Sequence, residues 1–150
     1  MRGLTIIGAG SEAGELAVAR TACEVLREGG SSPSLYEPGL DETTDAGALL
    51  DGARAAASGD VLVTVLGGGL LAPVTPRLSV RDLAASLGAP VVIALSGGPD
   101  AVNVARLSVE SARAARLAVK AVVVPEGESG AQLDGLVDVP VETLPANPTA

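Results

Sequence analysis

The stretch IIGAGSEAGELAVAR (Ile6–Arg20) decides the fold, because it passes from an apolar segment through closely spaced glycines into a helical pattern. Leu4–Gly8 is apolar and rich in isoleucine, which is typical of a buried strand, and a helix is predicted over Ala13–Arg27. In α/β proteins the helix that follows such a glycine-rich connection usually offers its N-terminus to a phosphate group. The stretch therefore predicts an α/β protein with a candidate phosphate site near its start.

Two interpretations of this stretch compete. One is a dinucleotide-binding fingerprint, which also requires an acidic residue at the end of the second strand, where this chain has Glu37. The other is a phosphate-binding P-loop that has lost its lysine. The glycines within Gly8–Gly14 do not have the third-glycine spacing of the dinucleotide fingerprint, so that interpretation is the minor one.

The composition predicts one domain with an unusual core. The chain has 150 residues and is 47% hydrophobic, but it has no Phe, no Trp and a single Tyr. Its core must therefore be built from Val, Leu, Ile and Ala, which suits a parallel sheet covered on both faces by helices with small side chains. We expect a single domain over residues 1–145 and a flexible tail over 146–150.

Charge and residue usage exclude several classes of function. The net charge is −8 and there is no basic run, which argues against nucleic-acid binding. No apolar run reaches the length of a membrane span, and the first residues do not resemble a signal peptide, so we expect a cytoplasmic protein that does not bind membranes. The absence of His and the single Cys23 exclude most zinc sites and nucleophile systems, so no metal is expected and Cys23 is predicted to lie in the core.

Strands and helices alternate along the chain. Strands are predicted at Leu4–Gly8, Ser34–Gly39, Asp60–Val65, Val91–Leu95, Val119–Val124 and Val137–Pro145. Helices are predicted at Ala13–Arg27, Ser79–Gly88 and Ala101–Arg116, with an acidic helix or loop over Leu40–Gly59. Ser79 and Asp82 have the spacing of a capping box, and Asp100 is a candidate cap for the last helix. The alternation predicts a doubly wound, mostly parallel sheet.

Ligands of such sheets bind beyond the carboxyl ends of the strands. Four segments fall there, at Gly8–Gly14, Glu37–Gly39, Gly67–Gly69 and Ser96–Asp100. The candidate ligand-binding residues are Gly8, Gly10, Ser11, Glu12, Gly14, Gly67, Gly68, Gly69, Ser96, Asp100 and Asn103. Each polar member of this set has an alternative role as a cap or turn residue.

A longer stretch, LGGGLLAPVTPRLSVRDLAASLGAP (Leu66–Pro90), continues through an apolar strand to Gly98 and then into the helix that holds Asn103. In this order of motifs the chain resembles the dethiobiotin synthetase family, a branch of the P-loop NTPase fold related to the cobyrinic acid a,c-diamide synthases. The matching positions are Gly68, Gly69, Leu70, Leu71, Pro73, Asp82, Leu83, Leu87, Gly88, Pro90, Gly98, Asn103 and Glu110. The resemblance implies a shortened member of that fold and a homodimer, and it favours a degenerate P-loop at Gly8–Gly14.

The chain departs from this family at the positions that the resemblance implies for ATP and magnesium. Glu15 and Leu16 stand where the P-loop has its lysine and its magnesium-binding hydroxyl. Glu37 stands at a second lysine, while Val65 and Pro125 stand at the metal-binding glutamate and the adenine-binding asparagine. A degenerate Walker A motif, a pseudoenzyme and no cofactor are therefore expected.

Three hypotheses of function remain open, and so does the question of whether the chain is an enzyme. The first is a scaffold that binds a partner or a small cationic or neutral molecule, with Glu12 and Glu15 as ordinary first-turn acids. The second is an ATP-independent isomerase, dehydratase or cyclase in which Glu15 and Glu37 form a catalytic acid/base pair. The third is an atypical ATP-dependent dethiobiotin synthetase or ligase, the one case that requires ATP and Mg²⁺.

Overall fold

The computed structural model describes residues 2–10, 13–125 and 133–144. Six strands form one sheet in the order β2–β3–β1–β6–β7–β8, and each neighbouring pair is parallel. The strands are β1 Arg2–Gly8, β2 Pro33–Tyr36, β3 Val61–Leu66, β6 Val91–Ala94, β7 Val119–Pro125 and β8 Val141–Leu144. The predicted doubly wound parallel sheet is confirmed.

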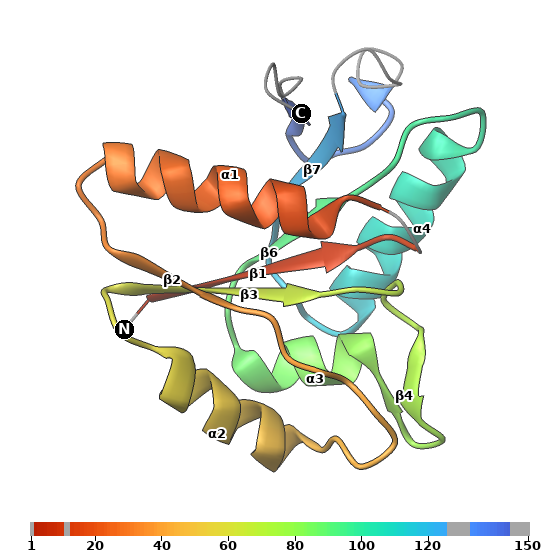
Figure 1. The fold of residues 1–150 in the computed structure, drawn as a ribbon. Helices are drawn as coiled ribbons and strands as arrows, with labels where there is room; N and C mark the ends of the chain where they lie inside the picture. The colour runs from red at the N-terminus through yellow and green to blue at the C-terminus, as the bar shows by residue number, and fades with distance from the viewer. Residues whose placement is uncertain (1, 11–12, 126–132, 145–150) are drawn as a thin grey trace.

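Helices cover both faces of this sheet (Figure 1). Helix α1 (Glu15–Glu28) lies on one face, and α2 (Ala46–Ala56), α3 (Val80–Leu87) and α4 (Ala101–Ala114) lie on the other. A small antiparallel hairpin of β4 (Pro73–Thr75) and β5 (Leu78–Ser79) precedes α3 and was not predicted from the sequence. Its strands are too short to give a periodic pattern.

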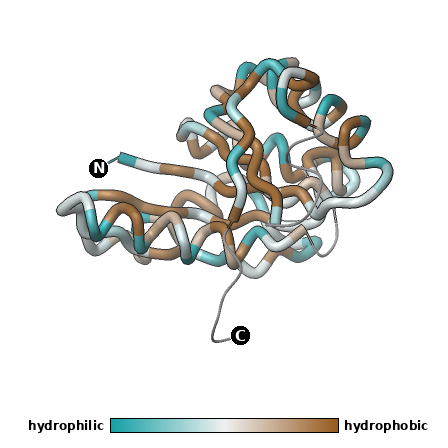
Figure 2. Tube along the Cα trace, turned by 90° about the horizontal axis from the view of Figure 1, so that it is seen from above, coloured by the Kyte–Doolittle hydropathy of each residue, from teal (hydrophilic) through white to brown (hydrophobic). Residues whose placement is uncertain are grey.

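The core consists of two aliphatic clusters, one on each side of the central strand β1. Ile6 and Ile7 are both fully buried, but they point to opposite faces because successive side chains alternate along a strand. Ile6 belongs to the cluster of α1, which includes Cys23, and Ile7 belongs to the cluster of Val80 on α3 and Val109 on α4. Figure 2 shows the hydrophobic residues running along the inner strands, with polar residues recurring on the outer turns of the helices. Cys23 is a buried free thiol, as predicted, and its burial raises its pKa.

Helix α3 begins at the predicted capping box. The Ser79 backbone N–H donates to Asp82 Oδ2 at 2.8 Å, and the Asp82 backbone N–H donates to Ser79 Oγ at 3.3 Å. The hydrogen bonds that the Ser79 backbone N–H and hydroxyl donate to the Asp82 carboxylate hold its pKa below the ordinary value. Arg81, which lies between these two residues, donates from Nη1 to the carbonyl and hydroxyl oxygens of Ser111 at 3.0 and 3.3 Å, which ties α3 to α4.

Two details differ from the sequence-based expectation. Asp100 occupies the N-cap position of α4, but its side chain makes no capping hydrogen bond, so the predicted cap is wrong. The acidic segment that follows β2 becomes helical only from Ala46, because Asp45 is the residue that caps it, accepting the Ala48 backbone N–H at 2.7 Å. Asp41 organises the loop before this helix by accepting hydrogen bonds from Thr43.

We predict that Ser79→Ala lowers the free energy of unfolding by about 1 kcal/mol, because it leaves the first turn of α3 without its side-chain cap. Urea denaturation followed by circular dichroism measures the difference. Ser86→Ala is the matched control, since Ser86 lies on the same helix and donates its hydroxyl only to the Asp82 carbonyl. Equal losses from the two substitutions would show that the cap does not stabilise α3.

Candidate functional site

The side chain of Glu15 lies across the carboxyl ends of β1 and β3. A Cβ atom added at Gly8 would lie 2.7 Å from Glu15 Oε2, and one added at Gly67 would lie 2.5 Å from Glu15 Oε1. Within the described part of the chain, no hydrogen bond or ion pair holds this half-buried carboxylate. The absence of a side chain at both glycines is what leaves room for it.

The loops that follow β1 and β3 lie side by side. Gly69 has a left-handed backbone with φ of 102°, and a Cβ there would lie 3.4 Å from the carbonyl oxygen of Ala9. Only glycine adopts this conformation without strain. The structure therefore brings together Gly8–Gly10 and Gly67–Gly69, and the backbone requires glycine at position 69 whatever the loops bind.

A cleft of about 310 Å³ lies between the β1–α1 connection and the β6–α4 connection. Its lining residues are Ala9, Gly10, Ala13, Leu95, Ser96, Gly97, Gly98, Pro99, Asp100, Ala101 and Val104. Ser96 and Asp100 thus share one cleft with Gly10, in line with their placement at the carboxyl ends of strands. Asn103 is exposed on α4 and is not part of this lining.

Gly14 marks the start of α1, with a left-handed backbone and no side-chain cap. Glu15 therefore lies in the first turn of the helix, where a carboxylate interacts favourably with the helix dipole. Ser11 and Glu12 lie outside the described residues. Among the residues that the structure describes, no three Asp, Glu or Cys side chains gather into a metal site.

Glu37 is exposed in the connection that follows β2 and makes no hydrogen bond to Glu15. The two belong to different places at the edge of the sheet, because β3 separates β2 from β1. Their role as an acid/base pair stays a prediction. The same order rules against the dinucleotide interpretation: the dinucleotide-binding sheet places its second strand directly beside the first, so that its acidic residue reaches the ligand.

Two positions that the family resemblance implies for magnesium are occupied by core side chains. Val65 is buried in the cluster beneath α1, and Leu16 packs against the same cluster. Neither offers an oxygen atom to a cation.

The sequence analysis placed the segments Gly8–Gly14 and Ser96–Asp100 at this cleft, but it did not name Ala9 or Ala13 as candidates and it missed Leu95, Ala101 and Val104. They are small or apolar, and only their position beside the flagged glycines could have indicated them. It also did not predict the contact of Glu15 with Gly8 and Gly67, since these residues meet only when β1 and β3 pair.

Comparisons with known proteins bear on the family and the fold of this chain. Residues 32–142 match the family model described as an AAA domain. The ATP-dependent dethiobiotin synthetase BioD of Anaeromyxobacter sp. (strain Fw109-5) is 42% identical over 78 residues, which are 51% of this chain and 35% of that protein. BioD of Anaeromyxobacter dehalogenans (strain 2CP-1) is also 42% identical, over 50% of this chain and 34% of its own length. The matches thus span about a third of the length of these curated relatives.

Solved structures share the fold at low sequence identity. A protein assigned to plasmid partition in Borrelia burgdorferi B31, bound to AMPPNP, has a TM-score of 0.63 and 11% identity over 99% of this chain and 88% of its own. FlhF complexed with GMPPNP and Mg²⁺ has a TM-score of 0.51 and 13% identity over 95% of this chain and 64% of its own.

In the described part of this chain, no helix is both long and apolar enough to cross a bilayer.

We predict that Gly67→Ala and Glu15→Ala are coupled in stability by about 0.5–1 kcal/mol, because the added methyl group and the carboxylate compete for the same space. A double-mutant cycle, measured by urea denaturation, gives the coupling energy. Gly10→Ala is the matched control, since a Cβ there meets none of the described atoms within 4 Å. Additive effects at position 67 would contradict the contact between the Glu15 side chain and Gly67.

Proposed function

The chain belongs to the AAA domain family and is a dethiobiotin synthetase-like P-loop protein, and we propose that its glycine-rich site does not bind ATP. In this proposal the fold is retained as a scaffold that binds a partner or a small molecule. The observation that supports this proposal most is the position of the Glu15 carboxylate, which lies across the carboxyl ends of β1 and β3.

The first argument for this proposal is the position of the Glu15 carboxylate. Ligands of a parallel sheet bind beyond the carboxyl ends of its strands, and β1 with its following helix forms the phosphate-binding end of P-loop proteins. A negative side chain in this place both occupies space and repels a phosphate. The missing side chains at Gly8 and Gly67 leave the space that the Glu15 carboxylate occupies.

The second argument is the size of the electrostatic repulsion between this carboxylate and a phosphate group. A carboxylate and a phosphate oxygen in contact repel each other by roughly 4 kcal/mol at an effective dielectric constant of 20. The favourable interaction of an anion with a helix N-terminus is about 0.3–2 kcal/mol, which is smaller. Magnesium would offset the difference only with oxygen ligands, and its two implied positions hold Leu16 and Val65.

We expect ATP with Mg²⁺ to leave the thermal unfolding midpoint unchanged. A ligand present at 100 times its Kd would add about 2.7 kcal/mol of stability, which differential scanning fluorimetry detects easily. A saturable upward shift of the midpoint at micromolar ATP would refute the proposal and return the chain to the ATP-dependent ligases.

The companion variant is Glu15→Lys with Glu37→Lys. If charge excludes phosphate, this variant gains affinity for inorganic triphosphate at low salt and loses it as the Debye length shrinks to about 10 Å at 0.1 M. Glu24→Lys with Glu28→Lys is the matched control, because it changes the net charge equally at the other end of α1, where both carboxylates are exposed. An equal gain in the control would mean that net charge alone, and not the site, governs anion binding.

We further propose that the protein is a homodimer. The support is the set of large aliphatic side chains that the described surface leaves exposed, including Val25 at 60%, Leu71 at 62% and Leu107 at 57%. A chain with so few aromatic residues has a thin core, and a second copy would bury further apolar surface. Light scattering at micromolar concentration is expected to give twice the chain mass of 14.7 kDa, and a monomer mass would contradict the dimer.

A further inference from the structure

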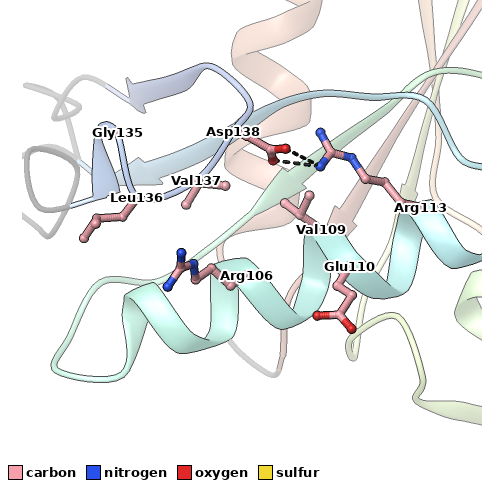
Figure 3. Close-up of a pocket in the computed structure, with 8 residues that line it drawn as sticks. All are labelled: Arg106, Val109, Glu110, Arg113, Gly135, Leu136, Val137 and Asp138. Carbon is pink, nitrogen blue, oxygen red and sulfur yellow. Dashed lines mark hydrogen bonds and ion pairs between the residues drawn. The ribbon is translucent and has the colours of Figure 1, made fainter.

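Another cavity lies beside α4 and shares no residue with the glycine-rich loops. It has a volume of about 490 Å³, within the range of small-molecule sites. Its lining residues are Arg106, Val109, Glu110, Arg113, Gly135, Leu136, Val137 and Asp138, drawn in Figure 3. Helix α4 forms one wall, and the segment Gly135–Asp138 forms the other.

The apolar part of this cavity is fixed by the core. Val109 and Val137 are 4% and 7% exposed and belong to the cluster between the sheet and α4. Gly135 has a left-handed backbone with φ of 80°, which turns the chain toward α4. Leu136 remains 47% exposed at the rim, so the cavity has an apolar floor and an uncovered apolar edge.

The lining holds two arginines and two carboxylates, and among the described residues only Arg113 and Asp138 form an ion pair. Arg113 Nη1 donates to both carboxylate oxygens of Asp138, at 2.6 and 2.7 Å, so these two charges neutralise each other. Figure 3 shows Glu110 projecting from α4 away from the Gly135–Asp138 segment, while Arg106 extends along the side that faces Leu136. Arg106 is exposed and has no ion pair within the described part of the chain.

We propose that this cavity binds a small monocarboxylate with a short apolar body. The planar guanidinium of Arg106 receives the carboxylate, for which its fork of N–H donors is well shaped. The apolar body lies over Val109 and Val137 and covers Leu136. Arg106 is the one arginine of this lining that is left to bind an anion, which suits a ligand with one negative charge better than a polyphosphate. This site goes beyond the proposed function, because it shares no residue with the cleft at Gly10 and Asp100.

Hexanoate is the probe that tests the site. Titrated into the ¹⁵N-labelled full chain, it is expected to shift the backbone amides of Arg106–Arg113 and Gly135–Asp138 in a saturable way, with a Kd on the order of 1 mM for so small a ligand. Hexanol and hexylammonium have the same apolar body, and we expect neither to saturate in this range. Equal binding of hexanol would overturn the assignment of a carboxylate site.

Substitutions at Arg106 and Asp138 test which charged group binds the carboxylate of hexanoate. Arg106→Gln is expected to weaken hexanoate binding about tenfold. Arg20→Gln is the control and leaves binding unchanged, because Arg20 is exposed on α1 and has no ion pair among the described residues. Asp138→Asn releases Arg113 from its partner and is expected to strengthen binding severalfold. An unchanged Kd in Arg106→Gln overturns the proposal. So does a concentration-dependent shift of the same amides without hexanoate, because a second copy then covers the cavity.

Discussion

The close packing of helices on both faces of β1 is the constraint on which the rest of the structure depends. β1 pairs with β3 on one side and β6 on the other, and Ile6 and Ile7 bury its two faces completely. With no large aromatic side chains in the core, Ala19, Ala84 and Ala105 are fully buried where helix meets sheet. Small residues at these contacts let the helices lie close to the strands. The start of α1 is thereby held near the strand ends, which places Glu15 against Gly8 and Gly67.

The sequence predicts the elements whose signals are local. β3, β6 and β7 are mostly apolar and rich in valine, and α3 carries both a capping box and a terminal glycine, Gly88, whose φ is 68°. The boundaries of α2 were poorly predicted because Gly47 and Gly52 weaken the helical pattern. Strand order could not be derived, since the pairing of β1 with β3 joins segments far apart in the chain and depends on how the helices cross over.

The sequence also predicts which loops converge at the candidate site, but not what fills the space between them. The carboxyl ends of parallel strands share one edge of the sheet, so the residue order alone places Gly10, Gly69, Ser96 and Asp100 there. It does not give the direction of the Glu15 side chain, because that direction depends on missing side chains at two glycines from different strands. The exposure of Glu37 and of Asn103 likewise depends on tertiary packing rather than on residue type.

The glycine-rich loops of this chain do not by themselves indicate nucleotide binding. Gly69 is needed because the backbone there is left-handed and close to Ala9, and this requirement holds with or without a phosphate. Whether the side chains next to these loops can bind magnesium is a better sign of a nucleotide site than the glycines are. Val65 is buried and Leu16 packs against the same cluster, so replacing either by a residue with a magnesium-binding oxygen would place an unpaired polar group in or beside an apolar cluster. Such a group costs about 1–3 kcal/mol when it finds no partner. The apolar cluster that holds α1 in place therefore disfavours an oxygen-bearing side chain at either position, so the packing of this helix and the absence of a magnesium ligand at positions 16 and 65 have one physical cause.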